Sequence, residues 1–510
     1  MSAGAKHVVV IGAGIGGLAA ALDLAACGMR VTVVERQPVP GGKMREVMID
    51  GNCIDSGPTV FTMRWVFEAL FADAGFSLAE RVGLTPATIL ARHSWPDGSR
   101  LDLHADLDLS TAAIAEFAGE SEARAYRRFA ARSQQVFETL DHSFMRVEKP
   151  GPVSLTAAAG IGGLPRLWAT RPFRTLWSEL GHVFRDPRLR QLFARYATYC
   201  GSSPFQSPAT LMLITHAERA GVWLVEGGMQ RLAEALALAA VDTGVEIRYR
   251  TAAKRIVADD CRANAVDLDD GTRLDADAVV FNGDVAALTA GLLGEDVRNA
   301  LPDRHGEARS LSAVTWSLCG RATGFPLEYH NVFFGADYAE EFDAIFGLGE
   351  ICAQPTVYVC AQDRGAGWIA PRAGTERLFL LVNAPPRVLS EAEIARAERL
   401  AFELLARHGL ELGKPNEPGK PGELAKPGKH RSDAVVTTPG DFAELFPGSD
   451  GAIYGWPTHG WSATFRRHGS RADLDGLYLA GGTVHPGPGV PMAALSGRIA
   501  AASIRADLLR

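Results

Sequence analysis

The stretch HVVVIGAGIGGLAAALDLAACGMRVTVVE, residues 7–35, decides the fold. It begins with a valine-rich apolar run, passes through glycines into an alanine-rich run, and ends in a second β-branched run. Valine-rich runs of this length are typical of buried parallel strands, and the alanine-rich run is typical of a helix. The sequence therefore predicts a strand at 7–11, a tight turn, a helix at 18–26 and a second strand at 31–34.

The turn has the pattern G-x-G-x-x-G, which is typical of a dinucleotide site. Gly12 permits the sharp turn, Gly14 lets a pyrophosphate approach the helix N-terminus, and Gly17 lets helix and strand pack closely. Glu35 ends the next strand, where an acid accepts ribose hydroxyls and disfavours a 2′-phosphate. The pattern predicts dinucleotide binding; the alternative is an ordinary glycine turn in an α/β sheet.

Two further glycine groups indicate which dinucleotide binds. Gly41 and Gly42 follow the second strand, and Gly51, Asp55 and Gly57 then form the pattern G-x-x-x-D-x-G. The whole pattern resembles that of the flavoproteins of the monoamine-oxidase and carotenoid-desaturase superfamily, with one spacer a residue shorter. The sequence holds no second G-x-G-x-x-G in a strand context for a nicotinamide cofactor. We therefore expect FAD, with hydride coming from the substrate; plain loop glycines are the alternative.

A second glycine-rich turn, AGGTVHPGPGVP at 480–491, lies near the other end of the sequence. Pro491 suits the first turn of a following helix, whose unpaired N–H groups and positive dipole end then face the ligand that the loop holds. Directed at the N1–C2=O edge of a flavin, these groups stabilise the charge of the reduced ring. The run therefore predicts the isoalloxazine end of the cofactor site.

The chain as a whole is predicted to be an α/β protein: an FAD-binding Rossmann-type (glutathione-reductase-like) domain with a discontinuous α+β substrate domain. We expect the cofactor domain at 1–85, 241–300 and 470–510. A helical region, facing substrate and membrane, is expected at 86–240. An antiparallel-sheet substrate domain is expected at 301–469, in which residues 413–430, with four Pro, four Gly and four Lys, predict a flexible loop.

Several segments have the period of one kind of element. Amphipathic patterns predict helices at 122–140, 229–240 and 391–408. The apolar run 278–281 is expected to rejoin the parallel sheet. Alternation predicts strands of the substrate domain, at 313–320, 356–362 and 378–383.

Composition excludes several classes of protein. Hydrophobic residues make up 47% of the 510, and the formal charge is −7, so we expect a globular protein without a general attraction for nucleic acid. Seven cysteines without a C-x-x-C pair predict neither a disulfide framework nor a zinc site, and the thirteen histidines show no metal-ligand spacing. The early uncharged run, 8–22, is too short to span a bilayer. We expect no metal and a cytoplasmic location.

Residues 151–200 are locally basic and aromatic. They contain two acids against Arg166, Arg171, Arg174, Arg185, Arg188, Arg190 and Arg195, interleaved with Trp168, Phe173, Trp177, Phe184 and Phe193. Arginine and aromatic residues without a long apolar run are typical of an interfacial segment that contacts anionic lipid head groups. The segment predicts peripheral association with the inner membrane; the alternative is an arginine-rich face that is solvated or paired within the protein.

Segments spread over nearly the whole chain resemble the bacterial phytoene-desaturase type of carotenoid dehydrogenases. They are residues 7–44, CIDSGPTVF (53–61), DPRLRQLFARYATYCGSSPF (186–205), GVWLVEGGMQRLAEAL (221–236) and GLYLAGGTVHPGPGVPMAALSGR (476–498). Within that family, HNVFF (330–334) and AIYGWPTHGWSATFRR (452–467) resemble the hydroxyneurosporene (methoxyneurosporene) dehydrogenases, which are 1-hydroxycarotenoid 3,4-desaturases. The loop 413–430 departs from the family pattern.

The resemblance implies FAD, a carotenoid as the long polyene substrate, and a set of cofactor-binding residues. These are Gly12, Gly14, Gly17 and Glu35 at the pyrophosphate and ribose, Gly42 and Lys43 in the second flavin loop, Ile256 or Val257 at the adenine, and Gly482, Gly489 and Val490 at the isoalloxazine ring.

Neither the residues nor the resemblance assigns a catalytic residue. Hydride transfer to flavin N5 from a bond beside a conjugated polyene leaves an allylic cation, whose adjacent proton is acidic enough for a weak base or water. His485 and Glu226 are candidates for that base, although a histidine that holds its own loop together is the stronger interpretation of His485.

The reaction implied by the resemblance is desaturation of an acyclic 1-hydroxycarotenoid, such as 1-hydroxyneurosporene, at the 3,4 bond. Alternatives are a phytoene or neurosporene desaturase of the same family, a flavin amine oxidase, and a non-catalytic isoprenoid carrier with the same fold. Both oxygen and quinone stay open as the acceptor that reoxidises the flavin.

Overall fold

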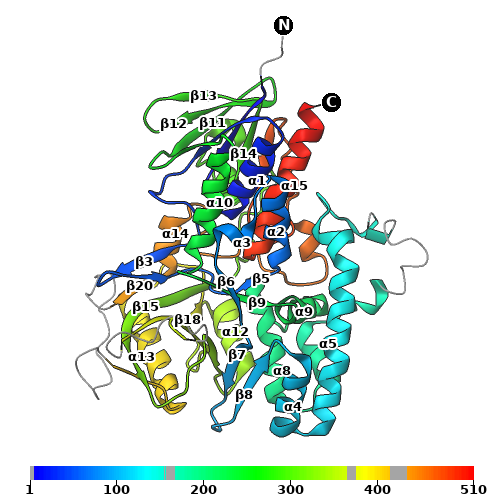
Figure 1. The fold of residues 1–510 in the computed structure, drawn as a ribbon, viewed down its shortest axis with the longest axis vertical. Coiled ribbons are helices and arrows are strands. Elements are labelled where there is room, and N and C mark those ends of the chain that lie inside the picture. The colour runs from blue at the N-terminus through cyan, green and yellow to red at the C-terminus, as the bar shows by residue number, and fades with distance from the viewer. Residues whose placement is uncertain (1–4, 154, 157–166, 365–374, 414–433, 510) are drawn as a thin grey trace.

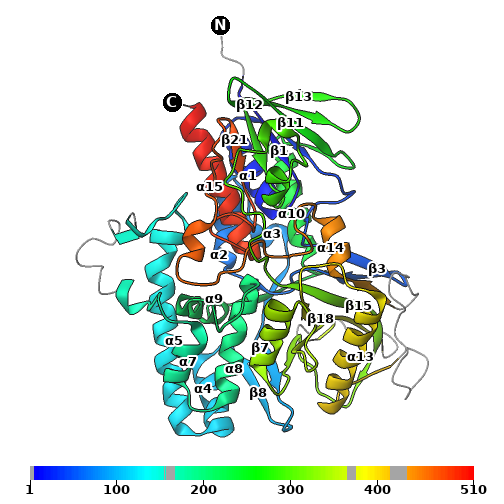
Figure 2. The same cartoon turned by 180° about the vertical axis from the view of Figure 1, so that it is seen from behind.

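The structure is a computed structural model that describes residues 5–153, 155–156, 167–364, 375–413 and 434–509. Except for Gly413, the predicted flexible loop 413–430 lies outside these residues. Figure 1 shows a parallel sheet with its helices at the top, a large mixed sheet at the lower left and a helical layer at the lower right. Seen from behind, the C-terminal helix runs beside the parallel sheet (Figure 2).

The parallel sheet has the strand order β10-β2-β1-β14-β21. Its strands are β10 (Glu246–Arg248), β2 (Arg30–Val34), β1 (His7–Ile11), β14 (Ala278–Phe281) and β21 (Leu477–Leu479). The strands predicted at 7–11, 31–34 and 278–281 are confirmed, and so is the α/β fold class.

The two faces of β1 pack against different layers because side chains alternate along a strand. Val8 and Val10 share a core with the helices α1 (Ile15–Ala26) and α10 (Gln230–Asp242). Val9 shares a core with a smaller antiparallel sheet, made of β11 (Ala253–Asp259), β12 (Arg262–Leu268) and β13 (Arg273–Asp275). Both faces are therefore covered, as the continuous apolar sequence of β1 requires.

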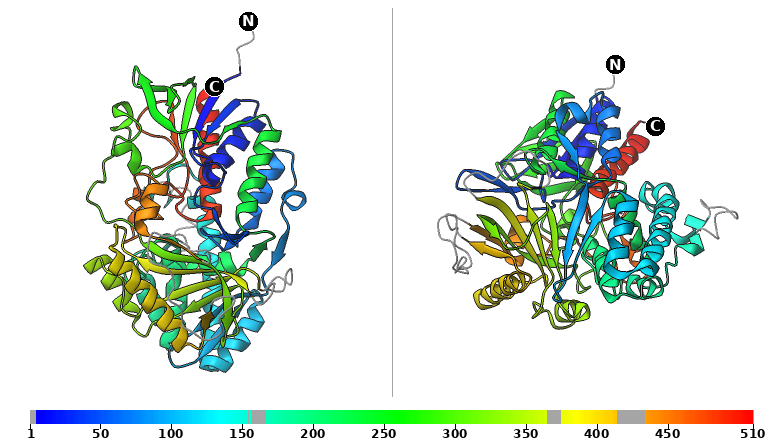
Figure 3. Two further views of the ribbon diagram at one scale, coloured as in Figure 1. Left: turned by 90° about the vertical axis from the view of Figure 1, so that its left-hand side faces the viewer. Right: turned by 60° about the horizontal axis from the view of Figure 1, so that its bottom comes forward.

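Helix α1 packs against both α10 and α15 (Val490–Leu508), so segments from three parts of the chain form one helical layer on the sheet (Figure 3). The helix predicted at 229–240 is confirmed as α10. It packs on α1 of the parallel-sheet unit, however, although its residues fall in the predicted helical region 86–240. The next strand, β10, pairs with β2, and this pairing keeps α10 beside the sheet.

The mixed sheet has the order β19-β15-β18-β17-β16-β7-β8, and β20 also pairs with β15. Its strands are β19 (Glu411–Gly413), β15 (Ser312–Thr323), β18 (Glu376–Ala384), β17 (Val357–Ala361), β16 (His330–Phe333), β7 (Ile89–Ser94), β8 (Arg100–His104) and β20 (Ala434–Thr437). Helix α13 (Glu391–Arg407) packs on it and begins with a capping box between Ser390 and Glu393. The strands predicted at 313–320, 356–362 and 378–383 and the helix predicted at 391–408 are confirmed.

Two features of the mixed sheet correct the sequence-based expectation. The strands within 301–469 pair antiparallel, as expected, but β16 also pairs with β7 from outside that range, and this pair runs parallel. Strands β7 and β8 also come from 86–240, which was expected to be helical. They form a hairpin around Asp97 and Gly98, and Gly98 has φ +82°, a conformation that favours glycine. An Asp-Gly pair between two alternating runs is a hairpin signal that the helical interpretation overlooked.

A helical layer lies beside the mixed sheet. It contains α4 (Leu107–Ala118), α5 (Glu120–Leu140), α7 (Leu176–Val183), α8 (Pro187–Ala194) and α9 (Leu213–Arg219), with a 3₁₀ segment at Arg195–Cys200 and α12 (Tyr338–Phe342) nearby. The helix predicted at 122–140 is confirmed as α5. No helix among the described residues is long and apolar enough to cross a membrane.

Shorter elements connect these layers. They are β3 (Glu46–Ile49) with β4 (Asn52–Asp55), the small sheet β5 (Phe61–Thr62), β9 (Val222–Val225) and β6 (Leu84–Pro86), and the helices α2 (Arg64–Asp73), α3 (Leu78–Arg81), α11 (Ala286–Thr289) and α14 (Pro439–Leu445). The overall domain boundaries stay predictions.

Candidate functional site

A cavity of about 1670 Å³ extends from the glycine turn after β1 to the mixed sheet. It is larger than the roughly 300–1,000 Å³ of a pocket for one small ligand. The residues predicted to bind the cofactor that line it are Gly12, Gly14, Glu35, Gly42, Lys43, Gly482, Gly489 and Val490. The fold therefore brings three distant segments of the sequence to one space.

The first glycine turn leaves no room for side chains. Gly12 has φ +100°, which disfavours any other residue. A Cβ on Gly14 would lie 2.9 Å from Nδ2 of Asn282, and a Cβ on Gly17 would lie 2.1 Å from the Gly12 carbonyl oxygen. Gly17 thus contributes to close packing of α1 behind the turn, as predicted, rather than lining the cavity. Bare backbone N–H groups at the start of α1 are suited to a phosphate.

Glu35 lies against the same turn. Its carboxylate accepts hydrogen bonds from the backbone N–H of Ala13 at 2.7 Å and of Gln37 at 2.8 Å. The side chain is buried yet lines the cavity. A carboxylate has about four acceptor positions, so two bonds leave capacity for ribose hydroxyls. Glu35 therefore fits the predicted role at the ribose.

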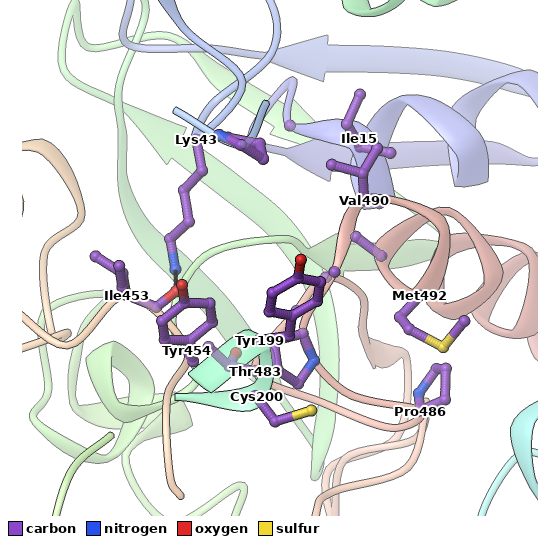
Figure 4. Close-up of a pocket in the computed structure, with 18 of the residues that line it drawn as sticks. Ile15, Lys43, Tyr199, Cys200, Ile453, Tyr454, Thr483, Pro486, Val490 and Met492 are labelled. Atoms are coloured by element: carbon purple, nitrogen blue, oxygen red, sulfur yellow. Dashed lines mark hydrogen bonds between the residues drawn. The ribbon is translucent and has the colours of Figure 1, made fainter. Parts of the chain in front are cut away.

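The predicted second flavin loop lies directly on the first turn, because Gly41 donates its N–H to the Ala13 carbonyl oxygen at 2.8 Å. The neighbouring Lys43 side chain runs into the cavity, where Nζ donates to the carbonyl oxygen of Ile453 at 2.7 Å (Figure 4). Burial lowers the pKa of Lys43, with Asp284 acting in the opposite direction. The loop thus brings a half-buried amine to the wall of the cavity.

The C-terminal glycine turn ends in α15, whose N-cap is Gly489 with φ +122° and whose first turn contains Pro491. Val490 and Met492 lie across the cavity from Lys43 in Figure 4. The first N–H groups of α15 carry the positive end of its dipole and lack partners within the helix. This arrangement suits the anionic edge of a reduced flavin, as predicted from the sequence.

Three other candidates lie away from the cavity lining of the described residues. Val257 is buried in β11, and the cavity reaches this part of the chain only at residues 251–253. Glu226 is exposed beside Gly83. His485 is buried, with Nε2 bonded to the Phe144 carbonyl oxygen at 2.8 Å. The contact agrees with the interpretation that His485 holds its loop in place.

The remaining cavity wall is mainly apolar but contains a buried polar network that the sequence did not reveal. Apolar lining residues include Leu140, Met145, Leu211, Ile214, Phe379 and Leu381. In the polar network, the Tyr199 hydroxyl donates to Glu218 at 2.6 Å and accepts from Nη1 of Arg195 at 2.9 Å. All three residues line the cavity. Arg195 falls both in the motif at 186–205 and in the arginine-rich segment 151–200, but neither signal indicates that it is buried.

Sequence comparisons assign the family. The family model for flavin-containing amine oxidoreductases matches residues 15–315. The hydroxyneurosporene desaturase of Rubrivivax gelatinosus is 48% identical over 510 residues, covering 98% of this chain and 94% of its own length. That of Cereibacter sphaeroides is 46% identical and covers 98% of each chain. The chain belongs to the hydroxyneurosporene desaturase family.

Membership of the hydroxyneurosporene desaturase family confirms the resemblance and makes the protein a flavin-dependent oxidoreductase. The fold agrees with that of a solved putrescine oxidase, with a TM-score of 0.61 over 98% of this chain and 99% of that one. At 16% identity, that likeness bears on the fold alone.

The arginine-rich segment of this desaturase is partly paired within the protein. Buried Glu179 forms ion pairs with Arg132, Arg171 and Arg174, and Arg188 pairs with Asp186. Phe184 and Phe193 are core residues. By contrast, Trp168 and Phe173 are 74% and 62% exposed and line the cavity. Arg166 lies outside the described residues. The surface that remains is both aromatic and basic, since Arg171 and Arg185 are exposed as well.

Proposed function

We propose that this protein is an FAD-dependent desaturase that introduces the 3,4 double bond into an acyclic 1-hydroxycarotenoid, such as 1-hydroxyneurosporene. One observation carries the proposal: a single cavity joins a glycine-lined dinucleotide site to an apolar chamber, in a chain 48% identical to a hydroxyneurosporene desaturase. A polyene leaves the bilayer only for another apolar environment, because exposure of its surface to water is costly.

The residues present fit FAD. Bare backbone at Gly14 suits the pyrophosphate, the buried acceptor Glu35 suits the ribose, and the N-terminus of α15 suits the flavin ring. When bound, the flavin supplies an acceptor for a hydride from the substrate. The protein's own task is then to bind the polyene, orient it and exclude water. The acidic proton left on the substrate requires only a weak acceptor, so no base is assigned.

The cavity also offers a route from the membrane. Trp168 lies 5.9 Å from Phe173, and Phe173 lies 5.4 Å from Trp461, between ring centroids. All three rings line the cavity and are exposed, Trp461 by 44%. Exposed aromatic rings are suited to the bilayer interface. We infer that this aromatic rim docks on the membrane surface and admits the carotenoid.

The proposed activity is tested with the flavin-loaded protein and membranes from a host that makes 1-hydroxyneurosporene, followed by polyene absorption. A red shift with this substrate and none with phytoene supports the 3,4-desaturase. A red shift with phytoene identifies a desaturase of the other substrate class, and peroxide released from amines identifies an amine oxidase. Failure of the protein to bind flavin on reconstitution would contradict the proposal that it is an enzyme. Comparing oxygen with quinone identifies the electron acceptor.

A further inference from the structure

The network of Arg195, Tyr199 and Glu218 is unusual because charged groups rarely face an apolar chamber without a task. Arg195 is 8% exposed and Glu218 is 5% exposed. Tyr196 also donates to Glu218, at 2.6 Å, but it is not among the described residues that line the cavity. The carboxylate therefore holds two tyrosines, of which only Tyr199 faces the chamber.

One nitrogen atom of this network is buried without a partner. Nε of Arg195 is buried and has no hydrogen-bond partner in the described part of the chain. The guanidinium stays charged: burial acts to lower its pKa, but the nearby Tyr199 and Glu218 raise it. A buried charged donor without a partner costs free energy unless a ligand oxygen accepts its hydrogen bond. The site therefore suits a ligand that has an apolar body and an oxygen atom at one end.

The covalent structure of the proposed substrate determines where in the cavity such an oxygen must lie. In a 1-hydroxycarotenoid only three covalent bonds, O–C1, C1–C2 and C2–C3, separate the oxygen from the carbon pair that is desaturated. The group that reads the hydroxyl must therefore lie close to the flavin end of the cavity. Figure 4 shows Tyr199 and Cys200 there, beside Tyr454 and Thr483 and between Lys43 and Met492.

We propose that Arg195 and Tyr199 bind the 1-hydroxyl group of the substrate and thereby select hydroxylated over non-hydroxylated carotenoids. The hydroxyl oxygen accepts from the Arg195 guanidinium, beside the Tyr199 hydroxyl. A carotenoid without that oxygen leaves the donor unpaired. The resulting loss of binding free energy discriminates between two substrates more strongly than a missing methylene group does. This assignment rests on the proposed function, because it supposes a carotenoid in the chamber.

Two hydroxyls compete for the role. Thr315 Oγ1 and Tyr338 Oη are buried without partners among the described residues, and both residues line the cavity. They belong to β15 and α12, on the side of the mixed sheet. Because neither is charged, an unmade hydrogen bond costs less there than at Arg195. Nη1 of Arg467 is another buried atom without a partner on the cavity wall, but this guanidinium already donates through Nη2 to the carbonyl oxygen of Trp456 at 3.0 Å. Tyr338→Phe therefore serves as a comparison in the experiment.

The test compares Tyr199→Phe and Arg195→Lys with Tyr196→Phe, which removes an equivalent bond to Glu218 from outside the cavity. For each flavin-loaded protein, kcat/KM is measured for 1-hydroxyneurosporene and for neurosporene, and the dissociation constants of both are measured by quenching of tryptophan fluorescence. We expect the hydroxyl preference in both readouts to fall at least about tenfold in Tyr199→Phe and Arg195→Lys and to persist in Tyr196→Phe. Thermal unfolding and flavin content confirm that each variant is folded.

An unchanged preference in Tyr199→Phe and in a folded Arg195→Lys would overturn the assignment. Collapse of the preference in Tyr338→Phe alone would assign the hydroxyl to the mixed sheet instead. Failure of the proposed function is seen separately, in the unsubstituted protein, as desaturation without any preference for the hydroxylated substrate or as no desaturation.

Discussion

A Cβ atom on Gly497 would lie 2.0 Å from the carbonyl oxygen of Gly16. The C-terminal helix α15 and the first helix α1 therefore touch backbone to backbone, and the two glycine turns that precede them open into one cavity. The packing of these helices sets the distance between the two ends of the candidate cofactor site.

We expect Gly497→Ala to lower the free energy of unfolding by about 1–3 kcal/mol, because the added methyl group forces α15 away from α1. Flavin affinity is expected to fall as well, since the displacement moves Val490 and its neighbours. Gly347→Ala is the matched control, because a Cβ there meets nothing within 4 Å. Chemical denaturation and flavin titration measure both effects; equal stability of the two variants would contradict the close packing.

Glu35→Gln is expected to raise the dissociation constant of FAD at least about tenfold. The substitution removes a charged acceptor from the ribose, and a hydrogen bond to a charged group contributes more than a neutral one. Equilibrium dialysis with the flavin-free protein measures the change. Glu68→Gln alters an exposed carboxylate on α2 and is expected to bind FAD normally. Comparable affinities for the two variants would argue against ribose binding by Glu35.

His485 makes stability depend on pH. Burial lowers its pKa to about 4, although the bond to Phe144 acts in the opposite direction, while the ordinary value is 6.5. Between these values the unfolded chain binds the extra proton, so the free energy of unfolding falls as pH falls from 6.5 towards 4.

The variant His485→Gln removes this titration but keeps an N–H donor for the Phe144 carbonyl. From pH 7 to pH 5 the unsubstituted protein is expected to lose about 2 kcal/mol more stability than the variant loses. Urea denaturation at each pH measures the difference. Parallel pH profiles would show that His485 titrates alike in the folded and unfolded protein.

Replacing the aromatic rim is expected to release the protein from membranes. The double variant Trp168→Ala, Phe173→Ala removes two rings whose burial at the interface contributes about 1.5–3 kcal/mol each, so binding to anionic vesicles is expected to fall more than tenfold. Leu348→Ala removes a side chain that is 73% exposed elsewhere and is expected to sediment with vesicles as before. Equal sedimentation of all three proteins would exclude docking through this rim.

Local properties of the sequence were sufficient to predict the strands and turns around the candidate cofactor site. Each of these elements depends on the residues of one strand or one turn. They are the valines of β1, the spacing of Gly12, Gly14 and Gly17, and the carboxylate of Glu35. Because such features depend on neighbouring residues in the sequence, they can be predicted without a structure. The Asp97-Gly98 pair is a hairpin signal of the same local kind, although it lies in the range 86–240 that is predicted to be helical.

Only the tertiary structure decided which of these residues meet. The sequence by itself determined the two glycine turns, but their union in one cavity depends on α15 packing against α1, across nearly the full length of the chain. Local composition likewise does not distinguish an arginine in solvent from Arg195, whose burial beside Glu218 is a property of several packed segments. Burial and long-range pairing arise from the whole fold, because each depends on surfaces supplied by residues that are distant in the sequence.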